Sequence, residues 1–405
     1  MTDILSDAAP ETVGLSETEL TKIDDLLAEV VEDGQFAGAS ILVARHGKVA
    51  HRAVAGVKDL VTGEPLAFDT VFRIFSMTKP VTAVAMMILY DQGLWRPEDP
   101  VAKHLPEFAE VKGPDGAALD HAPTLGEFMT HTAGFGYGIG PGPHDETDAA
   151  YIAAGIWQAT DLADFARKVA TIPLAYQPGS RWRYSLSMDL QGAIIERLSG
   201  MTLPDFMRTK IFRPLGMVDT DFYVPTEKLP RLATLYHKYF VEQLTVLDHP
   251  GFVRDPRVIP NIASGGGGLY STLGDYARFA QALLNKGELG GARIISEAAA
   301  DIMMQNHLPQ AILDAGVIAG AQKICPGRGY AYNGAVFHDP VLADSPVGRG
   351  TYQWDGASSV WFWIDPENDL LFVGMVQRMM QEGMPRMQEL TQALIAGALR
   401  SPPTS

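Results

Sequence analysis

The stretch "VFRIFSMTKPVTAVAMMILYDQG", residues 71–93, decides how the rest of the chain is interpreted. It predicts the end of a strand that runs into a helix apolar on nearly every face, which is typical of a helix inside a core. Ser76 and Lys79 stand three residues apart at its start, so they share one helix face. Proline is tolerated only in the first helical turn, so Pro80 indicates that the helix begins close to Ser76.

A serine and a lysine in this setting can carry chemistry. A serine hydroxyl is a poor nucleophile until a base takes its proton. A lysine in apolar surroundings has a lowered pKa and can be that base while it is neutral. Free N–H groups at the helix start would also stabilise negative charge on a carbonyl oxygen. Taken alone, however, an SxxK pattern is more often an N-cap serine followed by a lysine that reaches the surface.

Composition narrows the class of protein. A chain of 405 residues exceeds the roughly 250–300 at which one core stops growing, so two domains are predicted. Its 46% hydrophobic and 20% charged residues are an ordinary globular balance. The formal net charge is −16, with Lys and Arg scattered, which argues against binding to nucleic acid or to an anionic membrane. This charge suits neutral or cationic small molecules better than polyanions.

Neither a metal nor a cofactor is expected. Cys325 is the only cysteine, no CxxC or HExxH motif occurs, and the ten histidines are scattered. The first residues, "MTDILSDAAPETVG", lack the basic and apolar regions of a signal peptide. The longest apolar run, 81–90, is far shorter than the roughly 20 residues that a bilayer needs. We therefore expect a soluble cytoplasmic protein with no membrane or nucleic-acid partner.

Patterns along the chain predict strands at both ends and helices between them. Residues 16–34 have helical spacing, with Ser16 and Glu19 as a capping box, and 39–56 read as a hairpin turning at His46-Gly47. From about 255 come a Gly-rich turn with an amphipathic helix, two strands around "DPEND", and a last helix at about 385–399. Helical patterns fill the middle at 81–92, 124–131, 161–170, 187–199 and 203–210.

The predicted fold class is therefore α/β. An antiparallel sheet flanked by helices is built from both chain ends, residues 1–75 and 255–405, and a mostly α-helical domain, 76–254, is inserted in it. The active site is expected at their junction.

Two further segments could join Ser76 and Lys79. Tyr184 follows the turn "QPGSR" and precedes a helix, where it could relay a proton, although a core tyrosine is the commoner reason for such a residue. In "TYQWDGASS", 351–359, Gly356 would let the acyl group of a substrate lie against the backbone like an added strand. The N–H of Ala357 would then be a second oxyanion donor beside that of Ser76.

In this order the segments resemble the serine hydrolases of the class C β-lactamase and penicillin-binding-protein superfamily, and within it the family VIII carboxylesterases and related acyltransferases. The resemblance implies a β-lactamase/transpeptidase-like fold and covers nearly the whole chain. Five stretches carry it: "FRIFSMTKPVTAVAMMILYDQG", "TLGEFMTHTAGF", "YQPGSRWRYSLSMDLQGAIIERLSG", "IFRPLGMVDTDF" and "GGGGLYSTLGDYARFAQALLN".

The resemblance also implies roles. Ser76 would be the acylated nucleophile, Lys79 its general base and Tyr184 a proton-transfer residue in acylation and deacylation. Trp354-Asp355-Gly356 falls where lactamases carry Lys-Thr-Gly, which makes Trp354 and Gly356 candidate substrate-binding residues. Ala357 would line the oxyanion hole with Ser76.

Two departures weaken the case for antibiotic hydrolysis. Leu186 stands where lactamases have the asparagine of Tyr-x-Asn, and Trp354 replaces the lysine of Lys-Thr-Gly. The GxSxG elbow of α/β-hydrolases is absent, which argues against that rival serine-esterase architecture.

The leading hypothesis is a serine carboxylesterase that hydrolyses short- to medium-chain acyl esters through an acyl-enzyme. Alternatives are an acyltransferase or transesterase, a weak β-lactamase, and a non-catalytic module that binds peptide-like or lactam ligands. The loop 134–144 and residues near 240–260 are expected to shape the acyl pocket. The natural ester and the oligomeric state are left open.

Overall fold

The computed structural model describes residues 5–139, 144–249, 253–319 and 322–400. Their centre is a seven-stranded antiparallel sheet of order β11-β12-β13-β14-β15-β1-β2. Both ends of the chain supply it, since β1 pairs directly with β15, Ile41 opposite Gly374. The strands are β1 (Gly38–Arg45), β2 (Lys48–Gly56), β11 (Arg328–Tyr330), β12 (Ala335–Phe337), β13 (Thr351–Asp355), β14 (Trp361–Asp365) and β15 (Leu370–Val376). The predicted antiparallel sheet is confirmed.

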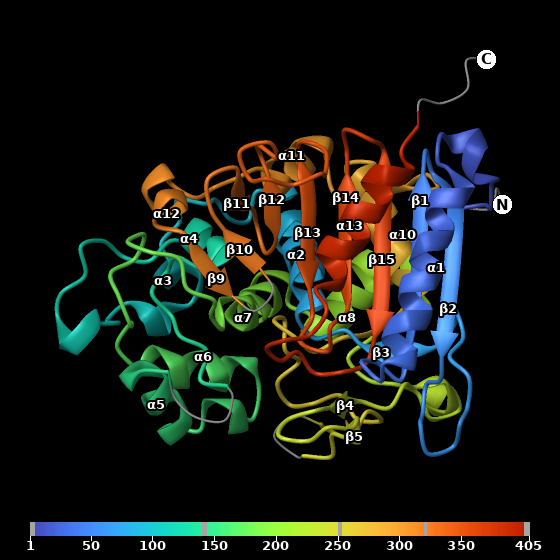
Figure 1. The fold of residues 1–405 in the computed structure, drawn as a ribbon. Helices are drawn as coiled ribbons and strands as arrows, with labels where there is room; N and C mark the ends of the chain where they lie inside the picture. The colour runs from blue at the N-terminus through green and yellow to red at the C-terminus, as the bar shows by residue number, and fades with distance from the viewer. Residues whose placement is uncertain (1–4, 140–143, 250–252, 320–321, 401–405) are drawn as a thin grey trace.

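Helices cover both faces of the sheet (Figure 1). One face packs against α1 (Glu17–Glu32) and α13 (Met387–Ala398), and the other against α2 (Thr78–Asp91) and α10 (Leu273–Leu284). Strand β1 is accordingly buried along its whole length. Its side chains alternate, so that Ile41 and Val43 join the cluster under α1, while Leu42 and Ala44 join the larger cluster around α2.

The start of α1 forms only half of the predicted capping box. The Ser16 hydroxyl accepts from Glu19 N–H at 3.4 Å. The Ser16 N–H, however, donates to Ala398 O, and the Glu19 carboxylate pairs with Lys22. Tertiary contact between the start of α1 and the end of α13 therefore replaces the second capping bond.

The middle of the chain is mainly helical, as its patterns predict. The main helices are α4 (Leu125–Thr130), α5 (Glu146–Ala153), α6 (Leu162–Ala170), α7 (Ser187–Ser199) and α8 (Leu203–Met207), and a π-helical turn, Arg208–Phe212, continues α8. Helix α5 has no counterpart among the predicted helices. The shorter elements are β3 (Val71–Arg73), α3 (Val101–His104), α9 (Arg213–Leu215), β4 (Tyr236–His237), β5 (Thr245–Val246), β6 (Tyr270–Thr272), β7 (Glu288–Leu289), β8 (Ala292–Arg293), α11 (Glu297–Met304), α12 (Gln310–Ala315), β9 (Val317–Ala319) and β10 (Gln322–Ile324).

Residues 351–376 form three strands, and the prediction of two was wrong. Strand β13 ends at Asp355, and the backbone then forms a turn in which the Gly356 N–H donates to Val360 O at 2.8 Å. A Cβ at Gly356 would collide with Ile74 O. The chain thus turns where β13 meets the segment just before Ser76, a contact that no local pattern encodes.

The division into 1–75 with 255–405 and 76–254 stays a prediction. Strand β3 pairs with β6, and one hydrophobic cluster extends from the helices of the middle segment to the sheet.

None of the helices in the described part of the chain is both long and apolar enough to cross a bilayer. The cytoplasmic location stays a prediction as well.

Candidate active site

Ser76 lies in a 3-10 turn, Phe75–Met77, that leads directly into α2. Pro80 is the third residue of α2, so the proline sits in the first turn as predicted. Phe75 has φ 41°, a left-handed conformation that a bulky residue rarely adopts. The Ser76 side chain makes no capping bond at the start of the turn or of α2, which leaves its hydroxyl available.

Lys79 is fully buried beside that hydroxyl. Its Nζ lies 3.1 Å from Ser76 Oγ, 2.6 Å from Gly266 O and 3.4 Å from Tyr137 OH. Burial lowers the pKa of Lys79 to about 7, although the charges of Asp189 and Asp355 oppose the shift. A large fraction of the amine is therefore neutral near pH 7 and able to accept a proton.

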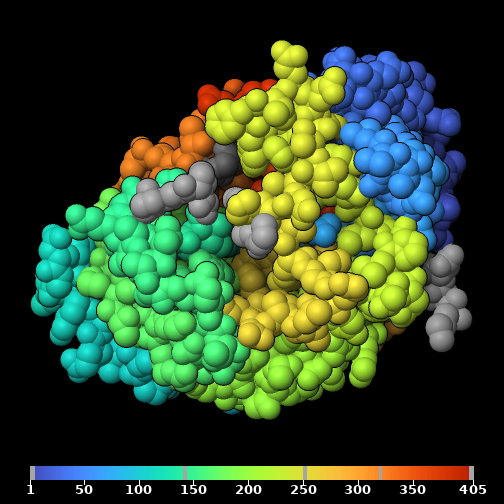
Figure 2. Space-filling view, turned by 90° about the horizontal axis from the view of Figure 1, so that it is seen from below, coloured from blue at the N-terminus to red at the C-terminus, as the bar shows by residue number. Residues whose placement is uncertain are grey.

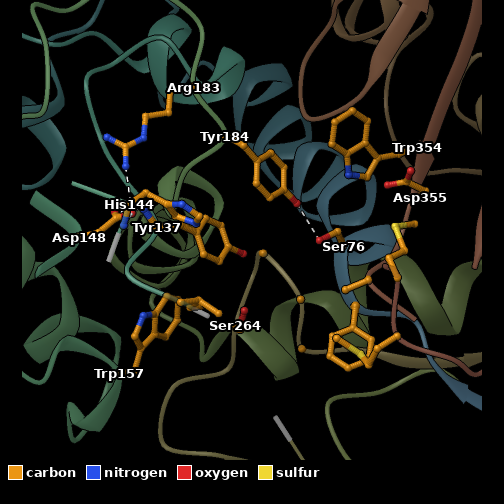
Figure 3. A pocket seen from close by; sticks show the side chains of 18 of the residues that line it. Ser76, Tyr137, His144, Asp148, Trp157, Arg183, Tyr184, Ser264, Trp354 and Asp355 are labelled. Atoms are coloured by element: carbon orange, nitrogen blue, oxygen red, sulfur yellow. Dashed lines mark hydrogen bonds and ion pairs between the residues drawn. The ribbon is translucent and has the colours of Figure 1, made fainter. Parts of the chain in front are cut away.

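Tyr184 faces the same oxygen from the segment before α7. Its hydroxyl donates to Ser76 Oγ at 2.7 Å (Figure 3). The ring centroid is 4.5 Å from Lys79 Nζ, a cation–π distance whenever the amine is charged. Burial raises the pKa of Tyr184 far above its usual value, so it remains a phenol that can donate a proton. The structure thus brings Ser76, Lys79 and Tyr184 together.

A second tyrosine, Tyr137, was missed at the sequence level. It stacks on Tyr184, with ring centroids 5.4 Å apart and an interplanar angle of 7°. The buried carboxylate of Asp148 holds its loop by accepting from the N–H groups of Tyr137 and Gly138, at 2.9 and 3.1 Å. Arg183 pairs with the same carboxylate at 3.0 Å. No spacing signal marks Tyr137, because its loop and α5 meet only in the folded chain.

The glycine-rich stretch 265–268 positions a carbonyl against the lysine. Asp189 Oδ1 accepts from Ser264 Oγ at 2.5 Å and from Gly266 N–H at 3.1 Å. A Cβ at Gly266 would lie 2.6 Å from Asp189 Oδ2, so only glycine lets this backbone approach and leaves Gly266 O aimed at Lys79. Asp189 is therefore an internal hydrogen-bond acceptor.

The end of β13 forms another wall of the site. Trp354 is 2% exposed and stacks on Tyr184, with centroids 6.0 Å apart and planes inclined by 26°. Asp355 accepts from Gln322 Nε2 at 2.7 Å, and burial raises its pKa to about 6. Ala357 lines the pocket, and its N–H donates to no acceptor among the described residues.

Gly356, unlike its neighbours Asp355 and Ala357, does not contribute to the wall of the pocket. Its missing side chain is explained by Ile74 O rather than by a substrate. Its role in substrate binding stays a prediction.

These walls enclose a cavity of about 980 Å³. In Figure 2 it is the hollow between the segment coloured green and those coloured yellow and gold. Tyr137, Ile139 and His144 line it from the predicted loop 134–144, and Arg254 lines it from the region near 240–260. Residues 140–143 and 250–252 lie outside the described part. No cluster of three or more metal-ligating side chains occurs among the described residues.

The protein is a serine hydrolase. Its class within the serine hydrolases is defined by an antiparallel sheet between helices, and by a serine and a buried lysine at the start of an apolar helix. The sequence model described as Beta-lactamase matches residues 23–396, and the chain belongs to that family.

Relatives extend over most of the chain. It is 33% identical over 364 residues to Protein Rv1367c of Mycobacterium tuberculosis, covering 87% of this chain and 88% of that protein. It is 32% identical over 364 residues to Esterase EstB of Burkholderia gladioli, covering 84% and 86%. Among solved structures, "EstCE1, a hydrolase with promiscuous acyltransferase activity" superposes with a TM-score of 0.80 at 26% identity, covering 94% of this chain and 99% of that one.

Proposed function

We propose that this protein is a carboxylesterase that hydrolyses short- to medium-chain acyl esters through an acyl-enzyme on Ser76. One observation carries the proposal: Ser76 Oγ lies within hydrogen-bond reach of both Lys79 Nζ and Tyr184 OH, at 3.1 and 2.7 Å. The similarity to a protein named Esterase EstB supports the same substrate class.

Acylation begins when neutral Lys79 takes the Ser76 proton and Oγ attacks the ester carbonyl carbon. The N–H groups of Ser76 and Ala357 stabilise the negative charge that develops on the carbonyl oxygen. The bond from carbon to the alcohol oxygen then breaks. Tyr184 gives its proton to the leaving alkoxide and is reprotonated from the Lys79 ammonium, which leaves an acylated serine and a neutral amine.

Deacylation runs the same steps with water as the nucleophile. Neutral Lys79 takes one proton from water, with the Tyr184 hydroxyl as a relay that ends protonated again, while the water oxygen attacks the acyl carbon. The Lys79 ammonium returns that proton to Ser76 Oγ when the bond from Oγ to the acyl carbon breaks and the carboxylic acid leaves. The fully buried amine suits this role, because its lowered pKa lets it gain and lose a proton near neutral pH.

The end of β13 favours esters over lactams. Trp354 offers a flat apolar wall for an acyl chain or an aryl leaving group. Leu186 is fully buried and presents no amide for a lactam side chain. Asp355, which lines the same pocket, disfavours a carboxylate placed beside it.

Acyl transfer is the second candidate. The name of EstCE1 includes promiscuous acyltransferase activity, and a cavity of about 980 Å³ has room for an alcohol in place of water. Hydrolysis and transfer differ only in which nucleophile reaches the acyl-enzyme. Measuring the acid and the new ester formed with added short alcohols separates them. A non-catalytic binding module is disfavoured, because Ser76, Lys79 and Tyr184 converge on one oxygen.

Labelling tests the nucleophile directly. A fluorophosphonate probe should label the wild-type chain at Ser76, and Ser76→Ala should neither be labelled nor hydrolyse p-nitrophenyl butyrate. The variant should keep its melting temperature, because the hydroxyl caps no helix. Wild-type turnover by Ser76→Ala would show that the nucleophile lies elsewhere.

A further inference from the structure

Two arginines on one side of the active-site pocket face no carboxylate. Arg73 ends β3, three residues before Ser76, and Arg254 lies in the segment before β6; both line the pocket. Their guanidinium carbons lie 5.6 and 5.8 Å from the centroid of the Tyr270 ring. Neither forms an ion pair within the described residues, and residues 250–252, outside that part, are uncharged Pro-Gly-Phe.

Apart from a contact between Arg73 and the Tyr270 side chain, the hydrogen bonds of these guanidiniums go to backbone carbonyls. Arg73 Nη1 donates to Ala233 O at 3.2 Å, and its buried Nε–H has no acceptor in the described part of the chain. Arg254 Nη2 donates to Phe222 O and Gly268 O. A guanidinium carries five N–H donors in a planar fork, so both side chains keep donors for a ligand.

The acidic groups around the pocket are engaged elsewhere. Asp145 and Asp148 both pair with Arg183, and Asp355 accepts from Gln322. The charged side chains lining the pocket are four arginines and three aspartates, with histidine counted as neutral: Arg73, Arg181, Arg183, Arg254, Asp145, Asp148 and Asp355.

This local excess stands in a chain whose formal net charge is −16. Burial lowers the pKa of Arg73, and the neighbouring charge of Arg254 acts in the same direction. Two like charges held this way are unfavourable until an anion lies beside them.

We propose that Arg73 and Arg254 bind a carboxylate carried by the ester itself, so that the enzyme prefers monoanionic esters to neutral ones of the same size. A planar carboxylate matches the guanidinium fork, and Arg73 and Arg254 both keep N–H donors for it. Apolar side chains of Phe75, Leu269 and Met379 line the same pocket and suit the uncharged part of the substrate. The inference rests on the esterase function proposed above.

The test compares matched ester pairs that differ only in charge. 4-Acetoxybenzoate against 4-acetoxybenzamide places the charge on the alcohol side. The mono-p-nitrophenyl ester of adipic acid against its terminal amide places it on the acyl side. In at least one pair the wild type should favour the anion in kcat/KM by about 10-fold or more, since hydrogen bonds to a charged group are strong.

Arg254→Gln should lower this anion-to-neutral ratio by about 10-fold. Arg257→Gln is the matched control, because Arg257 is exposed, pairs with Asp255 at 2.7 Å and does not line the pocket; its ratio should equal that of the wild type. A wild-type ratio at or below one in both pairs would overturn the carboxylate site. An equal loss for both members of a pair in Arg254→Gln would also overturn it, because it would show a structural role.

Calorimetry gives a readout that needs neither catalysis nor a folded variant. Benzoate should bind the wild-type chain at least about 10-fold more tightly than benzamide, and equal binding would overturn the site. Failure of the esterase proposal looks different: no ester of either charge is hydrolysed and no fluorophosphonate labels Ser76. Hydrolysis of neutral esters without a preference for anions leaves the esterase standing and removes only this inference.

Discussion

The pH dependence of acylation follows from the burial of Lys79. Its pKa is lowered to about 7, so the amine is charged below that pH and neutral above it. A general base must be neutral to accept the serine proton. About a tenth of the amine is neutral at pH 6 and about nine-tenths at pH 8, so kcat/KM should rise about 10-fold between them and then level off.

The assay is hydrolysis of p-nitrophenyl butyrate at low substrate, followed at the isosbestic wavelength of nitrophenol so that product ionisation does not distort the rates. The exposed Lys103, which pairs with Asp99, provides the control. Lys103→Met should keep the wild-type profile, whereas Lys79→Met should lose turnover by orders of magnitude at every pH.

Asp355 is the competing explanation, because its pKa of about 6 puts it in the same pH range. Asp355→Asn removes that group and also a charge that raises the pKa of Lys79. The rise in kcat/KM should therefore persist in this variant with a lower midpoint. A profile that is flat in the wild type, or a rise that disappears in Asp355→Asn, would refute Lys79 as the base.

The same buried amine links pH to stability. Its pKa is about 7 in the folded chain, against an ordinary value of 10.5. Between those values the unfolded chain binds more protons than the folded one. The contribution of Lys79 to the free energy of unfolding therefore increases as the pH rises from about 7 to about 10.5. Below pH 7 this contribution is at its most destabilising.

Two further outcomes are expected. Tyr184→Phe removes the hydroxyl 2.7 Å from Ser76 Oγ and should lower kcat severely. Tyr137→Phe removes the hydroxyl 3.4 Å from Lys79 Nζ and should lower kcat less. The kinetics of both variants on one ester test this order, and an unaltered kcat in Tyr184→Phe would remove Tyr184 from the mechanism. The kcat/KM for p-nitrophenyl butyrate should exceed that for nitrocefin by about 10- to 150-fold, because Trp354 replaces the lysine that would give the ring carboxylate a charged hydrogen bond. Arg73 of β3 and Arg254 before β6 line the pocket from other elements and do not take the place of that lysine. Comparable values on one preparation would favour a lactamase.

Sequence reasoning reached the parts of the site that lie on continuous elements. Ser76 and Lys79 are three residues apart on one helical start, so their contact is local and their spacing predicts it. Tyr184 is 108 residues further on, and local patterns favoured a core tyrosine there. Only the order of several family-like segments placed it beside Ser76, and the structure shows the hydrogen bond.

Contacts between distant loops were beyond such reasoning. Tyr137 reaches Lys79 because Asp148, on an unpredicted helix, holds its loop. Gly356 resembles a substrate-facing glycine in sequence, yet it is glycine because Ile74 O passes against it. The pocket arginines show the same limit, since a net charge of −16 describes the whole chain and not one cavity.

The sequence by itself determined the antiparallel sheet, the helices on its two faces, and the serine and lysine at the start of α2, because hydrophobic periodicity, turn residues and an i, i+3 spacing act over a few residues. Only the tertiary structure decided the pKa of Lys79, the partners of Tyr184 and the charge of the pocket. Those properties depend on burial and on which carbonyls, carboxylates and rings lie within a few ångströms, and these groups come from segments far apart in the chain.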